Sequence, residues 1–269
     1  MDDKIFTKPV IHGISITVPK ERVILKDEPF EHTEEIIKTT GIHEVRRAPK
    51  DKTVVDYSLN AAENLFKALD FEKAQIDGIV FSTPISDYLT PGNGYVVQKI
   101  LNLSKRCVIV DINQACAGWV NGLFQAFMLV QSGYCKNVLL CAGDTASLIH
   151  PKDKSMRMLL GDAGTATIVS AGESKSAFSF YNDGGVFEAL YIPAGGKRMP
   201  HKAGVTDIES VDENGNVRTL ENSHMDGLEV FAFTMAAVPK VVKNLFSIIH
   251  KGINNFSPII ICFIFNIIN

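Results

Sequence analysis

The chain lacks the features that mark nucleic-acid-binding, zinc-binding and disulfide-rich proteins. Its formal net charge is −3 and it has no long basic run, so nucleic acid is not an expected partner. It has five cysteines, an odd number, with no C-x-x-C pair among them. This usage argues against a zinc site or a disulfide framework and suits a reducing cytosol. We expect neither a metal nor a cofactor.

We also expect no segment that would direct the chain into a membrane or out of the cell. The first residues, Met1-Asp2-Asp3-Lys4, are acidic and no apolar core follows them, so we expect no signal peptide. The apolar stretch at residues 259–268 falls well short of the ~20 residues that a membrane-spanning helix needs. We interpret it as a buried strand, and we expect a cytoplasmic protein with no membrane partner.

What is present is the composition of a globular protein with a sizeable core, at 46% hydrophobic and 21% charged residues. Strand-like and helix-like patterns alternate along the first part of the chain. Because strand, helix and strand follow one another, we expect a mostly parallel sheet with helices on its faces. The predicted strands are residues 11–18, 78–82, 107–112, 138–142 and 159–169, and the predicted helices are 57–69, 95–103 and a helix from Cys116 to a cap at Gly133.

A second round of elements is expected after residue 176. Strands are predicted at residues 177–181 and 188–192, and a polar, solvent-facing loop at residues 206–222. A long helix is predicted at residues 227–249, where Pro239 should kink the helix or split it in two.

The most informative stretch runs from Asp111 to Trp119, with the sequence DINQACAGW. A buried strand ends there, and a helix begins within three residues at Cys116, which alanine and glycine flank. Small neighbours allow a sharp turn and a close approach to the sulfur. The positive end of the helix dipole favours the thiolate. The alternative, a buried structural cysteine, fits this setting less well, so we predict that Cys116 is a nucleophile.

The same stretch resembles the active-site region of the β-ketoacyl-acyl-carrier-protein synthase III family of thiolase-fold condensing enzymes. Further matches follow in the family's order and at about its spacing, up to roughly residue 250. They are Thr40-Gly41-Ile42 with Arg46-Arg47, Gly161-Asp162-Ala163-Gly164-Thr165-Ala166, Ile192-Pro193-Ala194-Gly195-Gly196, and Met225-Asp226-Gly227 ahead of Glu229-Val230-Phe231.

The resemblance implies an α/β, thiolase-like fold in which two βαβαβ halves stack in five layers. We place the N-terminal half, which carries the nucleophile, at residues 1–172. An incomplete C-terminal half follows at residues 173–269, because the sequence stops before the family's last strands. Gly161–Ala166 has no Gly-Lys-Ser/Thr, so we expect a tight turn beneath the active site rather than a phosphate loop.

The resemblance also implies an activity, a 3-oxoacyl-ACP synthase III type of acyltransferase. An acyl thioester donor, acyl-CoA or acyl-acyl-carrier protein (acyl-ACP), loads Cys116, and decarboxylative condensation with malonyl-ACP follows, in fatty acid or specialised acyl-chain biosynthesis. The implied assembly is a homodimer in which the loop from Tyr88 to Gly92 reaches the partner's acyl pocket. Thr40 and Lys154 would border the pantetheine channel; a turn threonine and a solvated lysine remain equally good interpretations.

Two departures from the family pattern bear on activity. Where the family has a His-Gln-Ala-Asn motif for the decarboxylation step, this sequence has Asn266-Ile267-Ile268-Asn269. Condensation is therefore doubtful on the sequence, and the alternative is a non-condensing pseudo-enzyme or partner subunit of a thiolase-fold dimer. Glu35 and Thr39 stand where acetyl-CoA-using members hold adenine with a tryptophan and an arginine, which disfavours acetyl-CoA. His201, His224 and His250 are candidates for the role of the missing histidine in decarboxylation. A surface or structural role is favoured for each of them.

Overall fold

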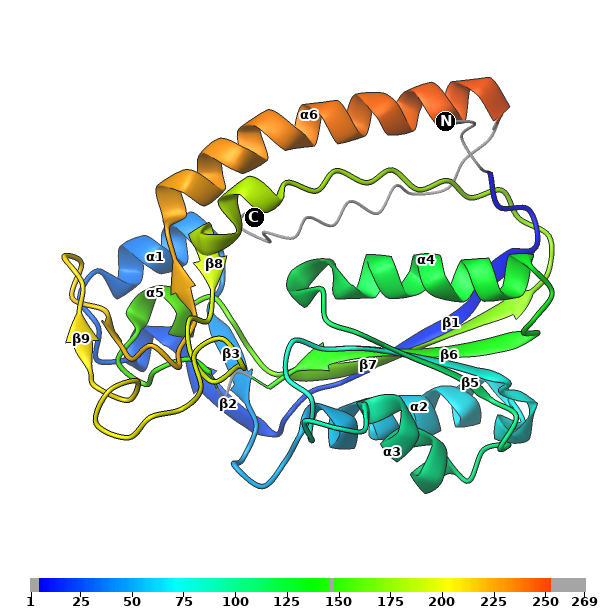
Figure 1. Ribbon diagram of the computed structural model, residues 1–269, viewed down its shortest axis with the longest axis horizontal. Coiled ribbons are helices and arrows are strands. Elements are labelled where there is room, and N and C mark those ends of the chain that lie inside the picture. The colour runs from blue at the N-terminus through cyan, green and yellow to red at the C-terminus, as the bar shows by residue number, and fades with distance from the viewer. Residues whose placement is uncertain (1–4, 146–147, 253–269) are drawn as a thin grey trace.

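A computed structural model describes residues 5–145 and 148–252 of the protein. Its centre is a five-stranded sheet in the order β1-β7-β6-β4-β5 (Figure 1). The strands are β1 Pro9–Thr17, β4 Gly78–Ser82, β5 Val108–Ile112, β6 Asn137–Asp144 and β7 Ala163–Ala171. Strand β4 pairs in parallel with β5 and β6, whereas β7 pairs antiparallel with both β6 and β1. Four strands thus share one direction, as predicted, and β7 opposes them, which the prediction missed.

Helices cover both faces of this sheet (Figure 1). Helices α2 Val54–Leu69 and α3 Asn93–Leu101 lie on one face, and α4 Gly118–Gln131 lies on the other. Successive residues of a strand point to opposite faces. Ile79 and Phe81 accordingly pack toward α2 and α3, while Val80 packs toward α4. This double burial explains why the central strand β4 is apolar at nearly every position.

A smaller unit beside the sheet was not predicted from the sequence. It contains α1 Thr33–Thr40, the paired strands β2 Glu21–Ile24 and β3 Glu44–Arg47, and the short helix α5 Lys154–Arg157. The buried side chains of Leu25, Val45 and Met158 form its core. We call it the α1/α5 unit.

Residues 172–183 run in an extended path over α4 (Figure 1). The strand predicted at residues 177–181 is wrong, because no strand among the described residues pairs with them. Instead Phe178 packs edge-on against Phe6, Phe124 and Phe127, with ring centroids 5.4–5.5 Å apart. The strand predicted at residues 188–192 is reduced to β8 Leu190–Tyr191, preceded by a 3₁₀ segment at Gly184–Ala189 and paired with β11 His224–Met225.

The long helix is confirmed as α6 Gly227–Gly252, but it continues through Pro239 without being split. Buried contacts at Val230, Ala237 and Ile248 hold the helix on both sides of the proline. Asp226 caps the first turn, since its Oδ1 accepts from the N–H groups of Leu228 and Glu229, each at 3.0 Å. By length and composition, the segment Gly227–Ile248 of α6 could cross a membrane, a property that core helices of soluble proteins share.

The solvent-facing loop predicted at residues 206–222 is only partly correct. It contains two short paired strands, β9 Ser210–Val211 and β10 Val217–Arg218. Thr206, Asn216 and Arg218 are buried, since their polar groups bind partners within the protein instead of water. Polar composition alone therefore did not identify the buried residues of this loop.

The large sheet lies wholly within the predicted N-terminal half, and β7 ends at Ala171. Within the described residues no second sheet of this size occurs. The division at residue 172 stays a prediction, and so does the homodimer. The predicted tail strand at residues 259–268 and the Asn266–Asn269 position lie outside the described residues.

Candidate active site

Cys116 lies at the edge of the sheet where parallel strands β4, β5 and β6 end. The chain leaves β5 at Ile112, forms a 3₁₀ turn at Ala115–Ala117 and continues directly into α4. Cys116 is the middle residue of that turn, so it precedes the N-terminus of α4. The positive end of the helix dipole therefore faces it. The strand-turn-helix setting expected from the sequence is confirmed.

The backbone just before the cysteine adopts an uncommon conformation. Ala115 has φ +41°, in the left-handed region that non-glycine residues rarely enter. Its small side chain limits the cost, and the turn closes through the Ala117 N–H, which donates to the Gln114 carbonyl at 3.0 Å. A sharp, strained connection of this kind presents a nucleophile at the end of a sheet.

Glycine at position 118 lets the first turn of α4 sit directly on the end of β4. A Cβ atom at Gly118 would lie 2.1 Å from the Ser82 hydroxyl oxygen, closer than any real contact. The next residue bridges to a more distant strand, since the Trp119 indole N–H donates to the Thr167 hydroxyl of β7 at 3.1 Å. No local sequence pattern predicts this bond, because Trp119 and Thr167 lie 48 positions apart.

The environments of the other described cysteines differ from that of Cys116. Burial raises the thiol pKa of Cys107 to about 12, of Cys135 to about 11 and of Cys141 to about 12. Cys116 is exposed, whereas Cys107 is half-buried and the other two are buried. At neutral pH the three shielded sulfurs remain thiols, and thiols are poor nucleophiles.

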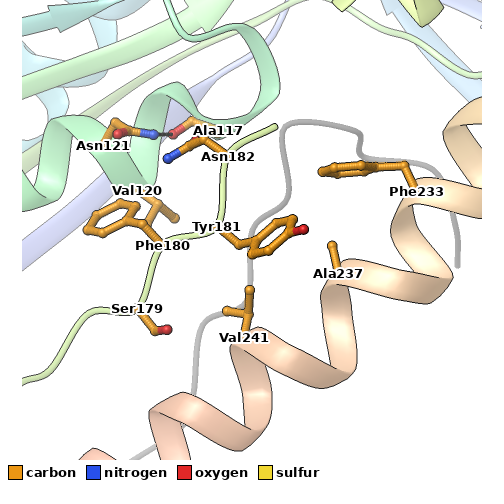
Figure 2. A pocket seen from close by; sticks show the side chains of 10 residues that line it. All are labelled: Ala117, Val120, Asn121, Ser179, Phe180, Tyr181, Asn182, Phe233, Ala237 and Val241. Atoms are coloured by element: carbon orange, nitrogen blue, oxygen red, sulfur yellow. Dashed lines mark hydrogen bonds between the residues drawn. The ribbon is translucent and has the colours of Figure 1, made fainter. Parts of the chain in front are cut away.

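A small pocket lies between the start of α4, residues 179–182 and α6 (Figure 2). It encloses about 40 Å³ next to Ala117, the residue that follows Cys116. Tyr181 reaches from the extended segment toward α6, where Lys240 Nζ lies 5.3 Å from its ring centroid. The lining residues are Ala117, Val120, Asn121, Ser179, Phe180, Tyr181, Asn182, Phe233, Ala237 and Val241.

Asp111, on β5 near its end, anchors the start of α3. Its carboxylate accepts from the Gly94 N–H at 3.1 Å, and a Cβ at Gly92 would lie 2.4 Å from its Cγ. Burial raises the pKa of Asp111, while the backbone hydrogen bonds lower it. The loop from Tyr88 to Gly92 leads into this helix, and its Leu89 is fully exposed. The role of that loop across a dimer stays a prediction.

The two predicted substrate-binding residues lie in the α1/α5 unit. Thr40 ends α1, and its hydroxyl donates to the Ile36 carbonyl at 2.8 Å and accepts from the Ile42 N–H at 3.2 Å. Gly41 follows with φ +70° and caps the helix. Lys154 is the first residue of α5. Their role in binding stays a prediction.

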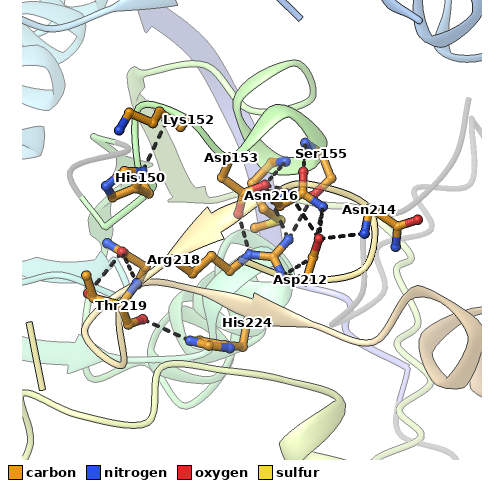
Figure 3. A network of polar contacts seen from close by, with 12 residues as sticks. His150, Lys152, Asp153, Ser155, Asp212, Asn214, Asn216, Arg218, Thr219 and His224 are labelled. Carbon is orange, nitrogen blue, oxygen red and sulfur yellow. Dashed lines mark hydrogen bonds and ion pairs between the residues drawn. The ribbon is translucent and has the colours of Figure 1, made fainter. Parts of the chain in front are cut away.

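A buried ion pair fixes the helix that carries Lys154 (Figure 3). Asp153 caps α5, accepting from the Met156 N–H at 3.1 Å, and its other oxygen accepts from Arg218 Nε at 2.5 Å. Arg218 also donates to Ser155 at 2.9 Å and to Asp212 at 3.1 Å. The side chains of Arg218 and Asp153 are only 10% and 1% exposed. The loop at residues 206–222 is thus held against α5 by the hydrogen bonds of Arg218 to Asp153 and Ser155.

The expected turn at Gly161–Ala166 is wrong. Residues from Ala163 onward belong to β7, and Gly164 allows α2 to cross closely, since a Cβ there would lie 2.4 Å from the Ser58 nitrogen. Asp162 is buried and accepts from the Ala48 N–H at 2.6 Å. The motif therefore joins β7 to α2 and β3.

Asp144, the last residue of β6, was not singled out from the sequence. Burial raises its pKa to about 7, against a backbone hydrogen bond from Thr145, and the nearby Asp162 adds to the rise. Its Oδ1 has no hydrogen-bond partner among the described residues. No sequence pattern distinguishes this carboxyl from an ordinary surface aspartate at a strand end.

His201 and His224, two of the candidates for the missing histidine's role, have structural partners. His201 Nδ1 lies 2.6 Å from Glu221 Oε1, which raises the pKa of the exposed imidazole. His224 Nε2 lies 2.9 Å from the Thr219 carbonyl oxygen. The side chain of His250 lies outside the described residues. At the predicted donor-binding positions, Glu35 is exposed and pairs with His32 at 3.3 Å, and the Thr39 hydroxyl donates to the Glu35 carbonyl.

Fold and site together define an α/β protein with an exposed cysteine at a helix N-terminus. Residues 110–184 match the family model of 3-oxoacyl-[acyl-carrier-protein (ACP)] synthase III. A putative 3-oxoacyl-[acyl-carrier-protein] synthase 3 from Campylobacter jejuni is 31% identical over 248 residues, covering 89% of this chain and 70% of that protein. A β-ketoacyl-[acyl-carrier-protein] synthase III from Fusobacterium nucleatum is 30% identical, covering 93% of this chain and 75% of that protein.

The fold agrees with the sequence comparison. A crystal structure of a 3-oxoacyl-(acyl-carrier-protein) synthase III superposes with a TM-score of 0.84 at 32% identity, covering 90% of this chain and 74% of that one. The chain therefore belongs to the 3-oxoacyl-[acyl-carrier-protein] synthase III family. The family and the thiolase-like fold implied by the sequence motifs are both confirmed.

Proposed function

We propose that this protein is a 3-oxoacyl-ACP synthase III-like acyltransferase that loads an acyl group from a thioester onto Cys116. The observation that carries the proposal is the position of Cys116, exposed in a 3₁₀ turn at the N-terminus of α4, where the next residue, Ala117, lines a small pocket. Among the described cysteines, the other three are shielded and hold their protons. Family membership points to the same residue.

The first step is acyl transfer. The Cys116 thiolate attacks the thioester carbonyl, and negative charge develops on the carbonyl oxygen. Backbone N–H groups at the turn, with that of Cys116 as the expected donor, stabilise this oxyanion. The C–S bond to the donor then breaks, the donor leaves as a thiol after taking up a proton, and the acyl group remains on Cys116.

The second step is decarboxylative condensation with malonyl-ACP, which releases CO₂ and yields a 3-oxoacyl-ACP for fatty acid or specialised acyl-chain biosynthesis. An acyl carrier protein and an acyl-CoA or acyl-ACP donor are the proposed partners. Thr40 and Lys154 are the proposed contacts for the pantetheine arm. A cytoplasmic homodimer is the proposed setting.

The two steps can be tested separately. The protein is incubated with radiolabelled acyl-CoA or acyl-ACP, and the label is mapped by peptide mass spectrometry. Label on Cys116, lost in the Cys116→Ala variant and retained in Cys107→Ala, supports acyl transfer. Addition of malonyl-ACP should then release labelled 3-oxoacyl-ACP. Loading without release would instead support the alternative, a non-condensing member of the fold, and no label on Cys116 with any donor would refute the proposal.

A further inference from the structure

The first turn of α4 is linked to β7 by a hydrogen bond that the acyl-transfer mechanism does not explain. We propose that the Trp119–Thr167 bond orients this turn on the sheet, and with it Cys116, so that Trp119 is a positioning residue for acyl transfer. This inference rests on the proposed function.

The bond is directional, and its acceptor is buried. Trp119 Nε1 donates to Thr167 Oγ1 at 3.1 Å, and Thr167 has no exposed surface. Thr167 lies on the α4-facing side of β7, two residues before Val169, which packs in the same core. A buried hydroxyl that loses its hydrogen-bond partner destabilises the protein. This cost favours the conformation in which the Trp119 indole stays bonded to Thr167.

Two other contacts of the turn limit its distance from the sheet or lie inside the same segment, without a directional bond to a strand. Gly118 rests on the end of β4, but the Ser82 hydroxyl makes no hydrogen bond within the described residues, so this contact limits distance alone. The Asn121 side chain donates to the Ala117 carbonyl at 3.0 Å, which is a bond inside the same segment (Figure 2). The Trp119–Thr167 bond ties the turn to a strand in a defined direction.

The orientation of Trp119 affects that of Cys116 because the two residues are three positions apart in the sequence. Cys116 lies in the 3₁₀ turn and Trp119 in the first turn of α4, and in helical backbone residues i and i+3 lie on the same face. A rotation of the turn that moves the indole on the sheet thus moves the sulfur as well. Acyl transfer needs the sulfur within about 3–3.5 Å of the carbonyl carbon, and small displacements from that geometry are costly in rate.

The competing explanation is that Trp119 only fills volume in the core. Trp119→Phe keeps an aromatic ring and removes the N–H, while Thr167→Val keeps the shape and removes the acceptor. Phe127→Leu, on the same helix but away from its first turn, is the matched control for lost packing. For each variant the acyl-loading kcat and KM, the rate of Cys116 alkylation by iodoacetamide against pH, and the melting temperature are measured.

We expect Trp119→Phe and Thr167→Val each to lower the loading kcat by about three- to tenfold with little change in KM, the range of one hydrogen bond. The double variant should lose no more than either single variant, because both remove the same bond. Phe127→Leu should lower the melting temperature and leave kcat unchanged. Additive losses, or losses in kcat that follow the melting temperature across all variants, would overturn the inference.

The molecule carries a built-in reporter, since Trp119 is the only tryptophan in the sequence. Its emission should change when Cys116 is acylated, and Thr167→Val should change the emission of the unloaded protein. The alkylation assay separates the two proposals. If no thioester loads Cys116, the proposed function fails, yet a slower alkylation of Cys116 in Trp119→Phe and Thr167→Val still supports positioning. Unchanged alkylation and loading in both variants would refute it.

Discussion

The sheet region, residues 9–171, and the region after it, residues 172–252, contain similar types of residue. They differ in the length of their strands and in how far their apolar side chains are buried. Strand β4 has five residues, all buried, whereas each strand of the later region has two. The helices differ in the same way. The apolar side chains of α4 pack against the sheet, while Leu228 and Met235 of α6 are 80% and 62% exposed. Packing on both faces, rather than apolar content, produces the regular sheet.

The aromatic pattern at residues 177–181 shows which structural features an alternation of apolar and small residues predicts. Phe178 and Phe180 alternate with small residues, and their rings are parallel within 4° at 6.2 Å. The backbone is indeed extended with one aromatic face, as the pattern indicates. That face is covered by Phe124 of α4 instead of by a sheet, at 5.4 Å from Phe178 and 5.1 Å from Phe180. Period-two alternation predicts extension and a buried face, but not a strand partner.

The largest expected effect concerns the sulfurs of the sheet region. At pH 7.5, limited iodoacetamide should label Cys116 more than about 10³-fold faster than Cys141, whose pKa of about 12 leaves almost no thiolate. Peptide mass spectrometry over time gives both rates. Labelling of Cys107 or Cys135 before Cys116 would contradict the assignment of the nucleophile.

The second prediction compares an arginine from each region. Arg218→Met should destabilise the protein by about 3–5 kcal/mol, because it leaves Asp153 buried without its cation. Arg22→Met removes the exposed Arg22–Glu44 pair and should cost less than about 1 kcal/mol. Urea unfolding of both variants measures the difference. Equal losses would mean that the Asp153–Arg218 pair does not hold the later region together.

The third prediction compares a glycine from each region. Gly118→Ala should cost about 2–3 kcal/mol, since the new methyl group would meet the Ser82 hydroxyl oxygen at 2.1 Å. Gly184→Ala has no atom within 4 Å of its Cβ and should be nearly neutral. Adding Ser82→Gly to Gly118→Ala should recover much of the loss, as melting curves of the double variant would show. No recovery would place the cause outside this contact.

The sequence predicted the sheet region well because its signals are local. The run at residues 78–82 and the cap at Gly133, which has φ +76°, lie where the patterns placed them. The turn at Cys116 was found because small residues collect between a strand and a helix. The Trp119–Thr167 bond and the Arg218–Asp153 pair join positions 48 and 65 residues apart, and no local pattern encodes such a distance. The α1/α5 unit was missed for a related reason, since its few core residues, Leu25, Val45 and Met158, come from three separate segments.

The smallest expected effect compares two carboxyls of the sheet region, one of which is paired with a cation from the later region. Asp153 has Arg218 as its cation, whereas burial raises the pKa of Asp144 to about 7. A folded-state pKa above the unfolded value of about 3.9 means that the stabilising contribution is present at low pH and is lost as pH rises through 7. Between pH 5.5 and 8, this carboxyl should lower the free energy of unfolding by about 1–2 kcal/mol. Asp144→Asn should lose that part of the pH dependence, which urea unfolding at a series of pH values would measure; an identical slope in the variant would show that Asp144 does not titrate in this range.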